Sequence, residues 1–183
     1  MTKNKEAIII VDMINDFVYG KFGGEGARNI IENMKHFLNE AESIGIPIFF
    51  PKDTHEKSDT ELEVWGEHAM KSDTGSEIID DLKDINAVKI EKNHFDAFFE
   101  TDLGSNLNDK GIDKVILGGV STDICVQNTA AGAFFRGYDI VVLEDCTAAI
   151  SEDKHETALE YMNNIYGAEI KNSKDVIQDW KNK

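Results

Sequence analysis

Cys125 stands out in this 183-residue sequence as a residue that could act as a nucleophile. It ends the stretch GGVSTDIC at residues 118–125, where an apolar strand pattern gives way to a helix pattern. We expect the helix to begin at Thr122 as N-cap, with the cysteine in its first turn, where unpaired N–H groups and the helix dipole stabilise a thiolate. The same N–H groups can bind an oxyanion. The alternative is a small buried hydrophobic residue, the commoner role of a lone cysteine.

Two further ionisable residues follow apolar runs. Asp12 closes the run AIIIV at residues 7–11, where an acid is costly to bury without a partner. Taken alone, Asp12 is best explained as a turn-forming residue, and Lys92, which follows a later run, as a solvent-exposed lysine. The second cysteine, Cys146, is interpreted as a packed thiol. No catalytic role is assigned to the histidines His36, His94 and His155.

The irregular segment at residues 51–75 contains side chains that could bind a metal. Asp53 and His55 form a D-x-H pair, and His68 follows, with Trp65 three residues before it. Carboxylate and imidazole ligands suit a divalent transition metal, and three of them leave coordination positions free for water or substrate. The alternative is a scatter of acids and histidines in an acidic loop, which the motif taken alone favours.

The elements that must position these residues follow an alternating pattern. Short apolar runs alternate with stretches of helical periodicity, which is typical of an α/β fold with helices on both faces of a parallel sheet. In such sheets ligands bind beyond the carboxyl ends of the strands, where Asp12, Lys92 and Cys125 lie. We expect strands at residues 7–12, 46–50, 88–91, 114–120, 139–143 and 168–171.

Helix boundaries are indicated by capping residues. The helix between the first two strands is expected to end at Gly45, and a second helix to begin with Thr74 and Glu77 in capping-box spacing. The other helices are expected to begin at Thr101, Thr122, Ser151 and Ser173. No linker rich in Gly, Pro or Ser divides the chain, so we expect a single domain over residues 1–183.

Composition excludes several classes of function. Lys and Arg number 19 against 35 Asp and Glu, and the net charge of −16 disfavours nucleic acid as a partner. The apolar runs are far shorter than the roughly 20 residues that cross a bilayer, and no secretion signal is recognised. Two cysteines do not make a disulfide framework, which points to the cytoplasm. The expected partner is a small molecule, and homo-oligomerisation stays open.

Three segments together resemble the isochorismatase-like cysteine hydrolases. They are IVDMINDF at residues 10–17, Lys92 followed by FDAF at 95–98, and GGVSTDICV at 118–126. Their order and spacing match the family, and the resemblance extends from the first strand to about residue 149. DTH at 53–55, WGEH at 65–68 and GSEI at 75–78 are similar to the metal-binding segment of the nicotinamidases within that family.

The resemblance implies a fold and a set of site residues. The fold would be a three-layer α/β/α sandwich, Rossmann-like, with a six-stranded parallel sheet of order 3-2-1-4-5-6 and a cis peptide before Ser121. The implied catalytic triad is Asp12, Lys92 and Cys125, and the amides of Ser121 and Cys125 would form an oxyanion hole. Phe17 and Trp65 would flank the substrate ring. A divalent metal ion, zinc, iron or manganese, would be held by Asp53, His55 and His68.

The implied activity is that of a cysteine amidohydrolase that converts nicotinamide to nicotinate and ammonia through a thioester. Asp12 would accept the thiol proton, Lys92 would offset the added charge, and the metal would place the pyridine ring. Such an activity would belong to NAD salvage. One alternative is another amidohydrolase of the family, acting on a carbamoyl or ureido compound. A second alternative is a catalytically silent isochorismatase-like domain that binds partners. A nucleotide-binding flavodoxin-like domain is disfavoured because no G-x-G-x-x-G or P-loop spacing follows the first strand.

Overall fold

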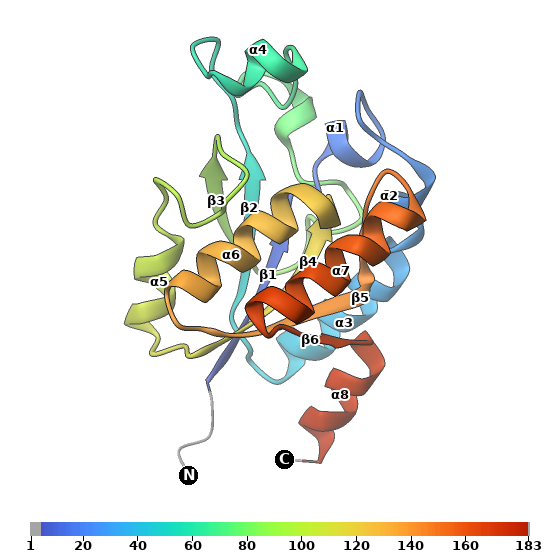
Figure 1. Ribbon diagram of the computed structural model, residues 1–183, viewed down its shortest axis with the longest axis vertical. Coiled ribbons are helices and arrows are strands. Elements are labelled where there is room, and N and C mark those ends of the chain that lie inside the picture. Colours follow the sequence, from blue (N-terminus) through green and yellow to red (C-terminus); the bar gives the residue numbers. More distant parts are fainter. Residues whose placement is uncertain (1–4, 183) are drawn as a thin grey trace.

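A single six-stranded sheet runs through the protein in the computed structural model, which describes residues 5–182 (Figure 1). All neighbouring strands are parallel, and the order β3-β2-β1-β4-β5-β6 confirms the predicted order. The predicted single domain also included residues 1–4 and 183, which lie outside the described part. The strands are β1 (Glu6–Val11), β2 (Ile48–Asp53), β3 (Val88–Lys92), β4 (Lys114–Val120), β5 (Asp139–Ala148) and β6 (Glu169–Lys171).

Helices cover both faces of the sheet, so the predicted three-layer α/β/α architecture is confirmed. On β1, Ile8 and Ile10 pack into the core beneath α3 and α8, while Ile9 and Val11 pack beneath α5, α6 and α7. This division follows from the alternation of side chains along a strand. The helical segments are α1 (Asn15–Val18), α2 (Glu25–Asn29), α3 (Ile31–Ser43), α4 (Glu61–Trp65), η1 (Thr74–Ser76), α5 (Leu103–Asp109), η2 (Thr122–Val126), α6 (Gln127–Phe135), α7 (Glu152–Tyr166) and α8 (Ser173–Lys181).

The end of β4 lies unusually close to β1. Gly119 has a φ of +108°, and a Cβ atom there would lie 2.0 Å from the carbonyl oxygen of Val11. Only glycine fits both that backbone conformation and that space. Gly119 therefore allows the segment after β4, which carries Cys125, to lie beside the segment after β1, which carries Asp12.

The helix predicted from Thr74 is wrong beyond its first residues. The helical turn η1 ends at Ser76, and the following apolar residues do not continue it. Instead Ile78 forms an antiparallel bridge with Ile14, and Ile79 N donates to the carbonyl oxygen of Met13 at 3.1 Å. Pairing with the segment after β1 therefore prevails over the local helical pattern.

The predicted helix starts are correct to within a residue or two. Ser151 caps α7 as predicted, and its side chain accepts from Lys154 N. Ser121 rather than Thr122 is the N-cap residue of η2, and Asn172 rather than Ser173 caps α8. Strand β5 is five residues longer than predicted, ending at Ala148. Among residues 5–182, we find no helix that is both long and apolar enough to cross a membrane.

Candidate active site

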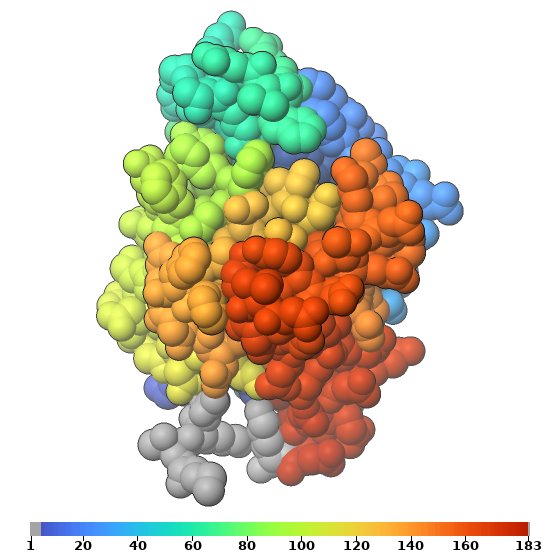
Figure 2. All heavy atoms as spheres, viewed as in Figure 1, coloured from blue at the N-terminus to red at the C-terminus, as the bar shows by residue number. Residues whose placement is uncertain are grey.

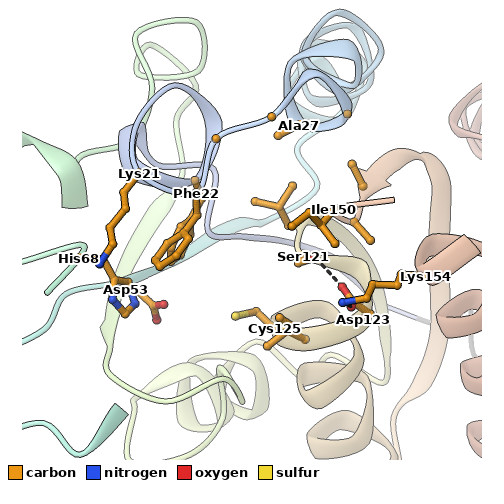
Figure 3. Close-up of a pocket in the computed structure, with 18 of the residues that line it drawn as sticks. Lys21, Phe22, Ala27, Asp53, His68, Ser121, Asp123, Cys125, Ile150 and Lys154 are labelled. Carbon is orange, nitrogen blue, oxygen red and sulfur yellow. Dashed lines mark hydrogen bonds and ion pairs between the residues drawn. The ribbon is translucent and has the colours of Figure 1, made fainter. Parts of the chain in front are cut away.

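A cavity of about 480 Å³ lies at the carboxyl ends of the central strands (Figure 3). This is where an open parallel sheet is expected to bind a ligand, because strand order reverses between β1 and β4. Cys125 lies between two walls: His68, Phe22 and Lys21 stand on one side, and Ile150, Asp123 and Lys154 on the other. Figure 2 shows the segment that carries α4 covering the end of the molecule beside the residues that follow β1.

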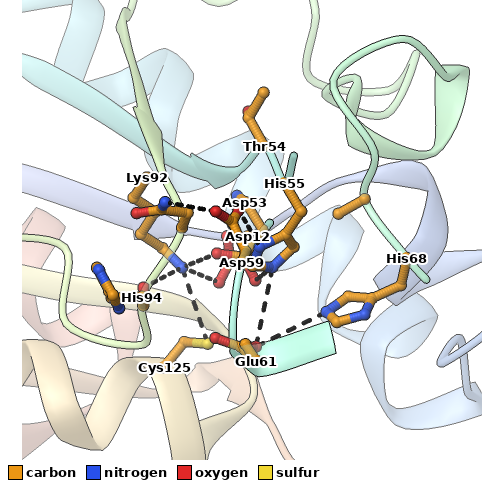
Figure 4. A network of polar contacts seen from close by, with 12 residues as sticks. Asp12, Asp53, Thr54, His55, Asp59, Glu61, His68, Lys92, His94 and Cys125 are labelled. Carbon is orange, nitrogen blue, oxygen red and sulfur yellow. Dashed lines mark hydrogen bonds and ion pairs between the residues drawn. The ribbon is translucent and has the colours of Figure 1, made fainter. Parts of the chain in front are cut away.

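Lys92 connects the three residues of the predicted triad (Figure 4). Its Nζ donates to Asp12 Oδ2 at 2.8 Å and to Asp53 Oδ1, and it lies 3.9 Å from Cys125 Sγ. Lys92 is in register with Asp53 on the neighbouring strand, so its side chain reaches across β2 to the residue after β1. One ligand atom each from Asp12, Asp53 and Cys125 lies within 4.8 Å of the others. The structure therefore brings the predicted triad together, with Asp53 as a fourth member.

The backbone holds the Asp12 carboxylate in place. Asp12 has a φ of +56°, in the left-handed region that residues other than glycine seldom adopt. Its Oδ1 accepts from Asp53 N at 2.8 Å, and its own N–H donates to the carbonyl oxygen of Pro51 at 2.9 Å. These contacts leave the second carboxylate oxygen for Lys92 and the thiol.

The buried charges shift one another's protonation. Burial and the Asp53 carboxylate raise the pKa of Asp12 to about 6, although Lys92 opposes the rise. Burial alone would lower the pKa of Lys92, but the carboxylates of Asp12 and Asp53 outweigh it and raise that pKa well above its usual value. Lys92 is therefore the charged partner, and Asp12 can accept a proton near neutral pH.

Lys92→Met is expected to lower the free energy of unfolding by about 3–5 kcal/mol, because it leaves two buried carboxylates without a counter-charge. Urea denaturation measures this effect. Lys83→Met is the matched control, because Lys83 forms an exposed i,i+3 pair with Asp80 and should change stability little. Equal stability of Lys92→Met and wild type would contradict the assignment of two buried carboxylates held by Lys92.

The expectation of a stabilised thiolate at Cys125 is wrong, because burial favours the protonated thiol. The cysteine lies in η2, a single π-helical turn, and is buried. Burial raises the pKa of the Cys125 thiol well above its usual value, and Asp12 and Asp53 add to the rise while Lys92 opposes it. Desolvation thus outweighs the helix terminus, and the thiol proton must pass to a base when the sulfur attacks. Cys146 is fully buried, in accord with its interpretation as a packed thiol.

A second cluster adjoins the triad at Asp53. Asp53, His55, Glu61 and His68 each place one ligand atom within 4.8 Å of the others. His68 Nε2 lies 3.7 Å from Glu61 Oε1, and His55 Nε2 lies 3.7 Å from Asp53 Oδ2. The three predicted ligands are thus brought together, and Glu61 joins them.

The histidines are oriented as metal ligands are. His55 Nδ1 contacts Asp59 Oδ2 at 3.1 Å, and His68 Nδ1 contacts the carbonyl oxygen of Gly66 at 2.7 Å. These contacts direct both Nε2 atoms toward the cluster. Within residues 5–182, Asp53 Oδ2 and His55 Nε2 are buried without a hydrogen-bond partner. A divalent cation would satisfy both atoms, so the residues present fit a metal.

Sequence reasoning missed Glu61 for a physical reason. Glu61 begins α4 in a segment that also contains Asp59, Glu63 and Glu67, and their identity alone does not separate them. Only the path of the chain between His55 and His68 decides which carboxylate turns inward. A one-turn helix between two histidines is the signal that could have directed attention to its first residue.

Aromatic rings line the wall of the cavity beside the metal-type cluster, which is the group of four possible ligands Asp53, His55, Glu61 and His68. Phe17 and Trp65, the two predicted substrate contacts, both line the cavity. Phe22 lies between them: its ring centroid is 6.0 Å from that of Phe17, 6.0 Å from that of Trp65 and 5.1 Å from that of His68. Sequence reasoning missed Phe22, whose place among the glycines after α1 carries no periodic signal.

Ser121 and Cys125, whose amides were predicted to form an oxyanion hole, also line the cavity. The peptide bond between Val120 and Ser121 is cis, as the resemblance implied. His94 contributes to the site through its carbonyl oxygen, which accepts from Lys92 Nζ at 3.1 Å.

Comparisons with known proteins agree with this geometry. The family model described as isochorismatase domain matches residues 6–174. Nicotinamidase 3 of Arabidopsis thaliana is 32% identical over 88% of this chain and 81% of its own length. The crystal structure of N-carbamoylsarcosine amidase from Thermoplasma acidophilum is 36% identical, with a TM-score of 0.87 over 92% of this chain and 96% of that one. Pyrazinamidase of Pyrococcus horikoshii in complex with zinc is 28% identical, with a TM-score of 0.83 over 92% and 99%.

The family model thus spans the sheet, the triad and the metal-type cluster, and its relatives include several amidases. The chain belongs to the isochorismatase family and is an amidohydrolase of that family.

Proposed function

We propose that the protein hydrolyses nicotinamide to nicotinate and ammonia through a thioester on Cys125. The observation that carries the proposal is the position of Asp53, which belongs to both clusters. Its Oδ1 accepts from Lys92, and its Oδ2 faces His55. A substrate ring beside the histidines would therefore have a carboxamide within reach of the thiol. The similarity to a nicotinamidase and to a zinc-bound pyrazinamidase supports the same substrate class.

In the first half-reaction Asp12 accepts the thiol proton while the sulfur of Cys125 attacks the carboxamide carbon. The charge that develops on the carbonyl oxygen is stabilised by the amides of Ser121 and Cys125. Lys92 keeps its proton and balances the negative charge of the site. Asp12 then returns the proton to the departing nitrogen, the C–N bond breaks, and ammonia leaves an acyl group on the sulfur.

In the second half-reaction the same carboxylate acts on water. Asp12 takes a proton from a water molecule, whose oxygen attacks the thioester carbon. The C–S bond breaks, the sulfur recovers a proton from Asp12, and the acid product is released and loses its remaining proton to solvent as nicotinate. One base thus serves both halves, which its pKa of about 6 suits.

The aromatic wall and the metal-type cluster would place the substrate. Phe17, Phe22 and Trp65 would enclose the ring and exclude water. Asp53, His55, Glu61 and His68 would hold a divalent metal, zinc, iron or manganese, which as a Lewis acid would bind the pyridine nitrogen and fix the ring's orientation. Placement of this kind can lower a barrier by several kcal/mol, roughly 7–11 in well-oriented systems.

A second candidate is the hydrolysis of a carbamoyl or ureido compound. The cavity of about 480 Å³ has room for more than one small ring, and its wall opposite the histidines carries Asp123 and Lys154. These two charged side chains could bind a charged group of a carbamoyl or ureido substrate. The similarity to N-carbamoylsarcosine amidase supports this candidate.

Ammonia release from a panel of amides tests the proposal. Nicotinamide and pyrazinamide are expected to be hydrolysed at least ten-fold faster, by kcat/KM, than N-carbamoylsarcosine and a ureido acid. The opposite ranking would still agree with amide hydrolysis by this protein, but it would contradict nicotinamide as the substrate. No turnover of any amide, together with equally slow alkylation of Cys125 and Cys146, would instead favour a catalytically silent binding domain.

His68→Ala is expected to lose the metal, because it removes one of four ligands. Metal analysis of the purified protein should find close to one divalent ion per chain in the wild type and far less in the variant. His36→Ala, on the exposed face of α3, is the control and should retain the metal. Full nicotinamide turnover by metal-free protein would contradict the proposed placement of the ring.

A further inference from the structure

The turn that carries Cys125 is held by the first turns of α7. Thr122 Oγ1 and His155 Nδ1 form a hydrogen bond of 2.9 Å, and the adjacent Asp123 Oδ2 lies 3.9 Å from Lys154 Nζ. Two consecutive residues of η2 thus contact two consecutive residues of α7. Figure 3 shows the second of these pairs on the wall of the cavity next to Cys125.

The two contacts differ in strength. Lys154 has a side chain that is 59% exposed, and its contact with Asp123 is long, so this pair contributes little. Thr122 is fully buried, and a buried hydroxyl needs a hydrogen-bond partner. His155 supplies that partner from a different helix.

Thr122 also occupies a sensitive position. It lies between Ser121 and Cys125, whose amides and thiol carry out the proposed chemistry. Inside the turn, Ile124 N and Val126 N both donate to the carbonyl oxygen of Ser121 at 3.1 Å, and no side chain caps its start. A shift of Thr122 would therefore displace the oxyanion donors and the sulfur together.

We propose that His155 is a positioning residue: through its hydrogen bond to Thr122 it holds η2 so that the sulfur faces Asp12 and the two amides face one oxygen. The inference rests on the proposed role of Cys125 as the nucleophile and deepens it. His155 does not touch the substrate. It acts on the rate of the chemical step rather than on substrate binding.

Thr122→Val and His155→Leu test the inference by kinetics. Each removes the hydrogen bond, and each is expected to lower kcat roughly 10- to 100-fold with little change in KM, because small displacements of reacting groups are costly. Thr122→Ser keeps the hydroxyl and should restore most of the rate. The double variant should lose no more than either single variant, because both act through one bond.

Thr157→Val is the matched control on the exposed face of α7 and should keep the wild-type rate. Urea denaturation of every variant shows whether the protein compared is folded. His155 is only half-buried, so its replacement keeps the inference testable even if Thr122→Val does not fold. Wild-type kcat in folded His155→Leu would overturn the inference.

Alkylation of Cys125 by iodoacetamide gives a readout that needs no substrate. We expect it to slow about ten-fold in Thr122→Val and His155→Leu, because the thiol loses its alignment with Asp12, and to recover in Thr122→Ser. If the wild type turns over no nicotinamide but these alkylation rates differ as expected, the substrate proposal fails and the positioning role stands. Equal alkylation rates in all folded variants would overturn the positioning role alone.

Discussion

Cys125→Ala is expected to lower the turnover of nicotinamide by roughly 10⁴-fold or more, the loss typical when a nucleophile of a catalytic unit is removed. The sulfur of Cys125 lies 3.9 Å from Lys92 Nζ. Among residues 5–182, Cys125 is the only cysteine that lines the cavity. Without the Cys125 sulfur, the thioester cannot form and the first half-reaction cannot take place. Steady-state ammonia release measures the effect.

The control for this variant is Cys146→Ala. Cys146 is also buried, but it lies on β5, packs in the core and does not line the cavity. Its replacement is expected to lower stability slightly and to leave kcat close to that of the wild type. Mass spectrometry should show that the Cys125→Ala preparation contains no wild-type protein. Substantial activity in such a preparation would exclude covalent catalysis by this thiol.

Asp12→Asn is expected to lower kcat by roughly 10²–10⁴-fold, the contribution typical of a general base. Asparagine has the size of aspartate and keeps an oxygen that can accept from Asp53 N, the contact that Asp12 Oδ1 makes at 2.8 Å. It cannot take the thiol proton. Because burial keeps the Cys125 thiol protonated, loss of the acceptor should slow the attack of the sulfur and hence turnover.

Urea denaturation of Asp12→Asn separates the loss of a base from the loss of the fold. The substitution removes one of two carboxylates that share Lys92, so the remaining pair with Asp53 is still balanced. The variant is therefore expected to fold. Activity within three-fold of the wild type would mean that another group takes the thiol proton.

Much of the fold could be predicted because its signals are local or are carried by the family resemblance. The apolar runs of β1 and β4 are buried on both faces of the sheet, and such runs are read directly from the sequence. The strand order came from the resemblance. Given that order, Asp12 and Cys125 had to lie together, since parallel strands present their carboxyl ends at one edge.

The parts that were wrong or missed depend on tertiary contacts. The apolar residues after Thr74 have a helical spacing, yet Ile78 pairs with Ile14 from a distant segment. The sequence does not distinguish Glu61 from the other acidic residues of its loop, because only the folded path of the chain turns its side chain toward the histidines. The pKa of Cys125 depends on how completely its surroundings exclude water and on two carboxylates at the ends of other strands, and neither is visible in a helix-start pattern.

Mass analysis of the enzyme quenched during turnover of nicotinamide tests the central claim most directly. A covalent intermediate predicts a nicotinoyl group on the peptide that contains Cys125 and none on the peptide that contains Cys146. The adduct should appear within the first turnover and disappear as nicotinamide is consumed. Turnover without any adduct on Cys125, under conditions where release of ammonia precedes release of nicotinate, would contradict the thioester mechanism.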